Sequence, residues 1–258
     1  MLYMFYNHKE SMDVKTAQNQ LLHSVDRMYD LYLYLFLTFQ ELRASSLAKM
    51  EDRANKIRPT FDELNPNKKF VDNQLISKIM EAEPFQSLCK RRNIAWSSDE
   101  EQEVFRKLFI EVEKSEVYFE QMDNSESGFI QDRNFLISLF RAEIANSPLI
   151  YSFFEEQDIG WIDDIDLACS MVIKTLKSMS ENDAFEILPL YKEDDDEKEF
   201  IKTLLKQTIS LDSESEKLIG TLADNWDIDR IAKMDVLLLK MAFAELQSFE
   251  SIPTKVTI

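Results

Sequence analysis

The chain has 258 residues, 45% of them hydrophobic and 11% aromatic, which is enough apolar side chain for one large folded domain or two ordinary ones. Only three glycines and six prolines are present, too few for the tight turns of a sheet protein, so we expect an all-α fold. The formal charge of −18 excludes nucleic-acid binding through a generally basic surface, and any RNA contact needs a local patch of cations.

The charge is unevenly distributed along the chain. Residues 1–110 hold 16 Lys and Arg against 16 Asp and Glu, whereas residues 111–258 hold 14 against 32 and carry the whole −18. Within residues 43–93, 11 basic side chains outnumber 7 acidic ones. This stretch therefore has a local basic excess of four.

Cysteine usage and hydropathy indicate the compartment. Cys89 and Cys169 are far apart and form no CxxC pair, which favours a reducing compartment over a disulfide framework. The N-terminus lacks the basic start of a signal peptide. The most apolar run, residues 31–39, is too short to span a bilayer. These features predict a cytoplasmic protein without a membrane segment.

The first half of the chain is dominated by helical spacing. Residues 13–57 carry apolar side chains at every third or fourth position, which predicts one long helix or a closely jointed pair. The Arg58-Pro59 step ends it, because the residue before a proline avoids the α region. Shorter helices are predicted at about residues 70–92, 98–121, 131–146 and 163–179. Asp163 or Asp164 is expected to cap the last of these.

The C-terminal part predicts a small bundle. Five carboxylates at residues 193–197 precede an amphipathic segment, and acidic residues at a helix N-terminus oppose the positive end of its dipole. Residues 228–249 are apolar around most of the circumference, which predicts a central helix buried on most sides. Its neighbours are expected at 198–209 and 213–224, and Pro253 is placed to start another helix.

We therefore expect three consecutive segments. The first is a helical N-terminal region with an insertion, the second a helical connector with the acidic run, and the third a C-terminal bundle incomplete at its last helix. Their expected bounds are residues 1–150, 151–195 and 196–258.

No catalytic constellation can be drawn from the sequence. The two histidines, His8 and His23, form no zinc pattern, and no glycine-rich phosphate loop is present. Residues 123–128 resemble the start of a calcium-binding EF-hand loop, but position twelve is Asn134 rather than the glutamate that calcium needs. We expect no enzymatic activity, no cofactor and no bound metal.

Residues 225–258, NWDIDRIAKMDVLLLKMAFAELQSFESIPTKVTI, resemble the C-terminal signature of the NusB family. The matching parts are the Asn-Trp pair, a short Asp-Arg turn, Asp235 opening a Leu-rich helix that ends in Ala-Glu-Leu, and the following Ile-Pro-x-Lys-Val. The segments HSVDRMYDLYLYL and LNPNKKFVDNQLI resemble the enlarged form of the family in the Bacteroidetes-type branch. The resemblance implies a NusB-like pair of helical bundles with an enlarged helical N-terminal and insert region, lacking both extreme termini of the family.

The resemblance also implies a non-catalytic transcription antitermination factor. Members pair with a small-subunit ribosomal protein, and the pair binds the single-stranded boxA element of ribosomal RNA leaders. The elongating RNA polymerase, reached indirectly, then resists termination. For the acidic insertion, at about residues 70–195, docking of polymerase and shielding of the bundle are both open.

Single-stranded RNA needs cations for its phosphates and flat rings for its bases. Tyr3 and Tyr6 are candidate stacking residues, with core aromatics as the alternative. Lys255 is the preferred cation, with a solvated surface lysine as the alternative, because it lies in a connection rather than a packed helix. The candidate cations within the matched signature are Arg230, Lys240 and Lys255. The segment that corresponds to the family's protein contact is Glu250, Ser251, Ile252 and Pro253.

Two other functions remain as alternatives. An RNA cytosine methyltransferase can carry a NusB-like domain at its N-terminus, followed by a catalytic cysteine and a glycine-rich cofactor loop. A reading frame extending far beyond Ile258 would indicate it. A protein-only helical scaffold fits the acidic half of the chain, and a salt-dependent shift of a boxA-like RNA would exclude it.

Overall fold

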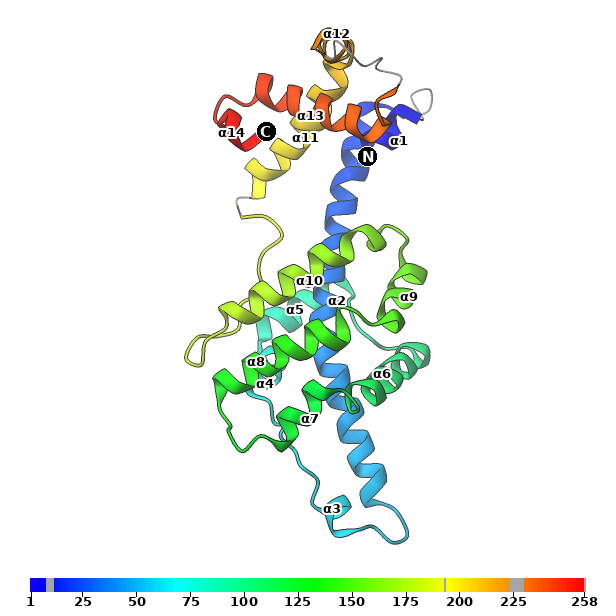
Figure 1. Cartoon of the computed structure of the whole chain (residues 1–258), viewed down its shortest axis with the longest axis vertical. Coiled ribbons are helices and arrows are strands. Elements are labelled where there is room, and N and C mark those ends of the chain that lie inside the picture. Colours follow the sequence, from blue (N-terminus) through cyan, green and yellow to red (C-terminus); the bar gives the residue numbers. More distant parts are fainter. Residues whose placement is uncertain (8–11, 193, 223–229, 258) are drawn as a thin grey trace. The chain divides into compact units, whose positions relative to one another are not determined.

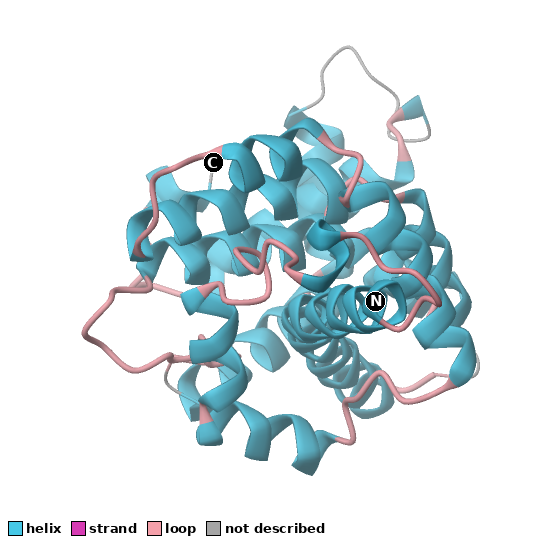
Figure 2. Ribbon diagram, turned by 90° about the horizontal axis from the view of Figure 1, so that it is seen from below, coloured by secondary structure: helices cyan, strands magenta, loops and turns pink. Residues whose placement is uncertain are grey.

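The computed structural model describes residues 1–7, 12–192, 194–222 and 230–257, and every regular element in these ranges is a helix (Figure 2). The predicted all-α fold is thus confirmed. His8, Glu193 and the Asn225-Trp226 pair lie outside the described residues. The elements are α1 (Leu2–Asn7), α2 (Val14–Ala54), α3 (Phe61–Leu64), α4 (Gln74–Glu81), α5 (Glu83–Arg92), α6 (Asp99–Val112), α7 (Glu116–Asp123), α8 (Phe129–Leu139), the π-helical turn η1 (Phe140–Ile144), α9 (Pro148–Gln157), α10 (Trp161–Ser178), α11 (Asp194–Ser210), α12 (Asp212–Leu222), α13 (Lys233–Ser248) and α14 (Thr254–Thr257).

The helices group into two compact units. The terminal unit comprises Met1–Asp26 and Pro189–Ile258, and the middle unit comprises Arg27–Leu188. The first turns of α2 belong to the terminal unit and the rest to the middle unit. The structure thus groups the residues differently from the three consecutive segments expected, because α1 and the start of α2 pack with the C-terminal helices. Boundaries near residues 150 and 195 stay a prediction.

The middle unit is built around α2, with α4 to α10 arranged about it (Figure 1). Tyr32, Phe36 and Phe39 recur at helical spacing and are wholly buried. The ring centre of Phe36 lies 6.1 Å from that of Phe85, and the ring centre of Phe39 lies 5.7 Å from that of Phe140. The apolar run of α2 is therefore a core segment. Among the described helices, none is long and apolar enough to cross a membrane.

Two helices predicted as continuous are each broken in two. The helix expected at 70–92 is split into α4 and α5 at Ala82. Pro84, in the first turn of α5, lacks an N–H and its ring clashes with a preceding helical turn. The helix expected at 98–121 is split into α6 and α7, and Ser115 caps α7 by accepting a hydrogen bond from Tyr118 N (3.2 Å).

The start of α10 also differs from the prediction. Its N-cap is Gly160, and Asp163 and Asp164 lie inside the first turn, so the expectation that one of them caps the helix is wrong. Trp161 anchors this end, because its indole N–H donates to the Arg27 carbonyl oxygen (2.8 Å). The two carboxylates favour the helix by opposing its dipole instead.

The terminal unit joins the two ends of the chain. Its core contains Leu2 and Phe5 of α1, Ala17 of α2, Leu205 of α11 and Leu237 of α13. α11 packs along α13, and α1, α12 and α14 also contact α13. The predicted neighbours of the central helix are therefore confirmed.

The central helix, α13, is nevertheless less buried than predicted. Leu237 and Ala244 are buried, but Met234, Leu238 and Leu239 are 56%, 57% and 47% exposed. The expectation of burial on most sides is wrong. The described neighbours reach only part of the circumference, so one face of α13 keeps apolar side chains at the surface.

Candidate nucleic-acid interface

Tyr6 and Lys240, both predicted site residues, meet inside the terminal unit. Tyr6 comes from α1 and Lys240 from the middle of α13, where its side chain is only 5% exposed. The Lys240 Nζ lies 5.1 Å from the centre of the Tyr6 ring. It also donates hydrogen bonds to Asp212 Oδ1 (2.5 Å) and Glu216 Oε1 (2.6 Å), both on α12. One ammonium thus ties α13 to α1 and α12.

The electrostatics of this cluster favour a charged lysine held by two carboxylates. Burial alone would lower the pKa of Lys240, but the hydrogen bonds and charges of Asp212 and Glu216 outweigh it and raise the pKa. Burial also raises the pKa of Tyr6, and the hydrogen bond and charge of Asp212 add to that shift. Lys240 is therefore paired with two carboxylates inside the terminal unit, and its contact with an RNA phosphate stays a prediction.

A hollow of about 420 Å³ lies beside this cluster and brings Tyr3 and Tyr6 together. Tyr3 is 47% exposed, so its ring is open to a ligand. Asn7, at the end of α1, and the exposed Lys233, at the start of α13, also line the hollow. Glu216 is its acidic member. A flat ring, an amide and a cation around one hollow are the groups that a nucleotide needs.

Lys233 and Asn7 were not among the site residues predicted from the sequence. Lys233 stands seven residues before Lys240, so both lie on one side of α13, but Lys233 is exposed whereas Lys240 is buried against Asp212 and Glu216. The seven-residue spacing in the sequence indicates this shared face. It contained no information about which of them meets carboxylates.

The remaining candidate cations are exposed. Arg230 precedes α13 and directly precedes Ile231, a lining residue of the hollow. The sequence placed Lys255 in a connection, but in the structure it lies in the four-residue helix α14. Its side chain is exposed, as expected. The structure does not place Lys255 among the residues that line the hollow.

The predicted protein-contact segment joins α13 to α14. Glu250, Ser251 and Pro253 are exposed, and Ile252 is half-buried. The segment is anchored at Phe249, whose ring centre lies 4.8 Å from that of Phe200 and whose carbonyl oxygen accepts a hydrogen bond from Ile252 N (3.0 Å). An exposed and anchored turn of this kind is suitable for contact with another protein.

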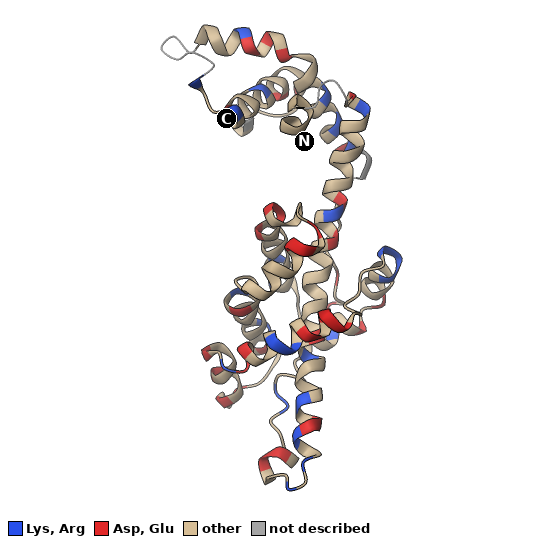
Figure 3. Cartoon of the chain, turned by 90° about the vertical axis from the view of Figure 1, so that its right-hand side faces the viewer, with Lys and Arg blue, Asp and Glu red and all other residues tan. Residues whose placement is uncertain are grey.

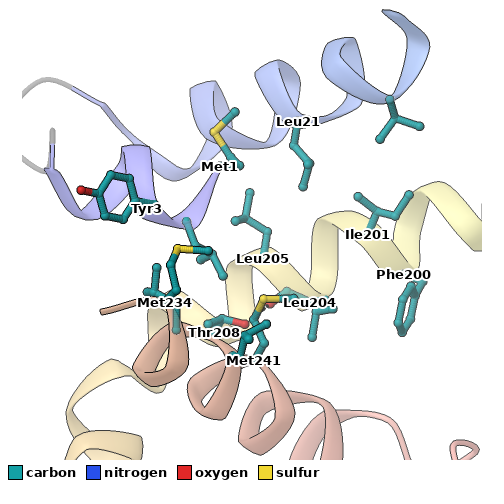
Figure 4. A pocket seen from close by; sticks show the side chains of 14 residues that line it. Met1, Tyr3, Leu21, Phe200, Ile201, Leu204, Leu205, Thr208, Met234 and Met241 are labelled. Atoms are coloured by element: carbon teal, nitrogen blue, oxygen red, sulfur yellow. Dashed lines mark hydrogen bonds between the residues drawn. The ribbon is translucent and has the colours of Figure 1, made fainter. Parts of the chain in front are cut away.

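A second hollow in the terminal unit, of about 360 Å³, is almost wholly apolar (Figure 4). Leu21 of α2, Leu204 of α11, and Met234 and Met241 of α13 face one another across it (Figure 4). Thr208 is one of its few polar members, and its hydroxyl donates to the Leu204 carbonyl oxygen (2.8 Å). Tyr3 also lines this groove, but no lysine or arginine side chain is among its lining residues to bind a phosphate.

Acidic and basic residues are mixed along the helices of each unit (Figure 3). The terminal unit holds 11 Lys and Arg against 18 Asp and Glu, a formal charge of −7. Nucleic acid can therefore contact this unit only where cations stand free of carboxylates.

Neither thiol has the features of a nucleophile. Cys89 and Cys169 are both buried, and burial raises the pKa of Cys89 to about 11 and that of Cys169 to about 12. Across residues 1–7, 12–192, 194–222 and 230–257, no group of three or more His, Cys, Asp or Glu side chains is arranged to hold a metal ion.

Comparison with known proteins places the similarity in the C-terminal part. Residues 167–258 match the model of the NusB family. The "Transcription antitermination protein NusB" of Salinibacter ruber is 36% identical over 99 residues, which are 35% of this chain and 61% of that protein. The protein of the same name from Lactiplantibacillus plantarum is 34% identical over 89 residues, 34% of this chain and 58% of that protein. The one from Natranaerobius thermophilus is 35% identical over 60 residues, 23% of this chain and 43% of that protein.

The chain thus spans between 43% and 61% of the length of these three relatives. No solved structure matches the chain. The matched range begins within α10 and contains α11 to α14, so it includes Lys233, Lys240, Lys255 and the turn before α14.

Proposed function

We propose, because residues 167–258 carry a NusB family domain, that this chain is a non-catalytic transcription antitermination factor. In this role it binds the single-stranded boxA-type element of ribosomal RNA leaders together with a small-subunit ribosomal protein. The elongating RNA polymerase is reached through that complex. The role places the protein in the cytoplasm. The observation that carries the proposal is the family match over α11 to α14.

The RNA surface that we propose is the hollow between α1 and the start of α13. Tyr3 offers an exposed ring on which a base can stack, and Tyr6 forms the inner wall. Lys233 supplies a cation for the adjacent phosphate. Arg230 and Lys255 extend the basic contact along the same domain. Lys240 supports this surface from inside by holding Tyr6 and α12 in place.

The protein surface that we propose is the exposed turn at Glu250, Ser251, Ile252 and Pro253. Ile252 offers a half-buried apolar contact, and Glu250 offers a carboxylate to a basic partner. Ribosomal proteins that bind RNA are generally basic, which complements the acidic terminal unit.

Fluorescence anisotropy with the full chain tests this function. A labelled boxA-type RNA and a scrambled RNA of equal length are titrated with the chain alone and with the chain plus the ribosomal partner. We expect tighter binding of the boxA-type RNA, and a further gain when the partner is present. Equal affinity for both RNAs, with and without the partner, would contradict the proposed function.

A protein-only scaffold is the second candidate. Its support is the charge of −7 on the terminal unit and the neutralisation of Lys240 by two carboxylates. In the same titration, a scaffold binds the ribosomal partner but gives no salt-dependent RNA signal in either mixture.

A further inference from the structure

Most cations of the middle unit are already neutralised or used in holding the fold. Lys49 and Arg53 pair with Glu113, and Arg92 pairs with Asp30. Others bind backbone oxygens: Lys78 donates to the carbonyls of residues 180, 181 and 183, and Lys69 donates to those of 124 and 126. The basic excess of residues 43–93 is therefore largely structural.

One pocket in the middle unit differs because its cations are not neutralised by carboxylates. It has a volume of about 290 Å³ and is lined by Arg133, Asn134, Ile137 and Ser138 of α8, Arg141 of η1 and Lys177 of α10. Half of the lining residues are cations and none is a carboxylate. Within the described part of the chain, none of the three cations forms an ion pair. Three uncompensated cations share one hollow in a unit that is otherwise acidic.

Local structure explains how the cations come together. Arg133, Ile137 and Arg141 are spaced by four residues, which puts them on one face of α8 and its continuation η1. Lys177 reaches the same pocket from the last turn of α10, which packs against α8. Arg141 lies in a π-helical turn, a rare conformation that is frequent at functional sites.

The cations are also accessible. Arg141 and Lys177 are exposed, and Arg133 is half-buried. Arg133 donates one N–H to the Met179 carbonyl oxygen (3.0 Å). A guanidinium has five N–H donors, so this bond fixes its position and leaves the others for an anion.

We propose that this pocket binds the phosphodiester backbone of single-stranded RNA. Arg133 and Arg141 are eight residues apart, about 12 Å along a helix, so they are better placed to reach two different phosphates of one chain than to share one free phosphate. Asn134 and Ser138 lie between them and offer neutral donors to the sugar-phosphate chain. This inference rests on the proposed function in one respect, since both require that the chain binds RNA. It adds a site that reads no sequence, and two of its three cations precede the matched range.

The test compares two charge reversals in the full chain. The pocket variant is R141E/K177E, and its matched control is K90E/R91E, which reverses two exposed cations at the end of α5 in the same unit. Both keep Arg133 and its bond to Met179. Affinity for a labelled scrambled RNA is measured over a range of salt concentrations. A scrambled RNA separates this contact from boxA recognition, so failure of one proposal does not imply failure of the other.

We expect the pocket variant to bind at least tenfold more weakly, with a salt slope smaller by about 1.4, because each phosphate contact to a single strand contributes about 0.7. The control should keep the slope of the parent chain. Equal losses in both variants, or no loss in the pocket variant, would overturn the proposal. So would the absence of any RNA binding by the parent chain.

A second measurement locates the contact. Phenylglyoxal modifies exposed arginines, and mass spectrometry of the peptides reports on Arg133 and Arg141 separately from Arg91. We expect RNA to protect both pocket arginines and inorganic phosphate at the same phosphate concentration to protect neither. Equal protection by inorganic phosphate would show a simple anion site and overturn the assignment to an RNA chain.

Discussion

Lys240 Nζ lies 2.5 Å from Asp212 Oδ1, so a buried ammonium of α13 is tied to the first residue of α12. The substitution Lys240→Met removes the cation and leaves two neighbouring carboxylates without it. Breaking a fully buried ion pair costs about 3–5 kcal/mol, and because the Glu216 side chain is 53% exposed we expect a smaller loss of about 2 kcal/mol. Urea unfolding followed by circular dichroism measures it.

The control for this prediction is Lys217→Met, an exposed lysine on α12, which should change the free energy of unfolding by about 0.5 kcal/mol or less. A stable Lys240→Met variant with weakened RNA binding would support Lys240 as a phosphate contact.

Tyr3→Ala tests the stacking surface. A base stacked on an aromatic ring contributes about 1–3 kcal/mol, so we expect RNA affinity to fall by about 5- to 150-fold. Stability should change little because the side chain is 47% exposed. Phe119→Ala removes a 69% exposed ring of the middle unit and serves as the matched control. Anisotropy with boxA-type RNA reports both, and equal affinities for the two variants would remove Tyr3 from the site.

Lys255→Glu tests the preferred cation. If Lys255 contacts a phosphate, its reversal weakens binding of the boxA-type RNA and lowers the salt slope by about 0.7. Lys217→Glu makes the same charge change at an exposed position of the same unit and should leave the slope unchanged. Parallel behaviour of the two variants would identify Lys255 as an ordinary surface lysine.

The sequence predicted the helices better than it predicted their exposure. Helical spacing was sufficient for α2, because its apolar stripe is long and no proline interrupts it before Pro59. It missed the break at Ala82, because a single proline in the first turn of a helix acts locally and leaves the spacing of apolar residues intact. Fold class therefore followed from the sequence, and two helix boundaries did not.

The candidate site could be predicted only in part. Tyr3 and Tyr6 were chosen for their chemistry and do line one hollow. Lys240 was chosen on the same grounds, but its environment depends on Asp212 and Glu216, which are more than 20 residues away in sequence. The spacing of residues within α13 cannot predict a contact with residues of another helix. The cations of the middle-unit pocket were missed for a related reason, since Lys177 is far in sequence from Arg141.

Glu41 gives a prediction about pH. Burial raises the pKa of Glu41 above its ordinary value of 4.5. The hydrogen bond that Gln102 donates to its carboxylate (2.9 Å) lowers the pKa, but burial has the larger effect. A carboxyl whose pKa is raised by folding contributes stability at low pH, and that contribution is lost as pH rises through the folded-state pKa. The substitution Glu41→Gln should therefore raise the urea midpoint at pH 7, with an advantage that shrinks as pH falls toward 4.5.

Glu100→Gln, the same change at an exposed position of α6, corrects for the general effect of removing one negative charge. The prediction fails if Glu41→Gln has a lower urea midpoint than the parent at pH 7 and the difference in midpoint between variant and parent is the same at pH 7 as at acidic pH. That result would contradict the burial of this carboxyl.

Leu237 and Leu238 are neighbours on α13 and test how that helix is covered. Leu237 is 9% exposed and belongs to the core of the terminal unit, whereas Leu238 is 57% exposed. Loss of a buried leucine side chain removes apolar burial and leaves a cavity, so Leu237→Ala should lower the free energy of unfolding by about 2–5 kcal/mol. Leu238→Ala should change it by about 0.5 kcal/mol or less. The two substitutions are chemically identical and one residue apart, so helix propensity cancels between them. Equal and large losses would mean that Leu238 is also buried in solution, as the apolar circumference of α13 had predicted. The apolar face of α13 that is exposed in the structure would then be covered in solution.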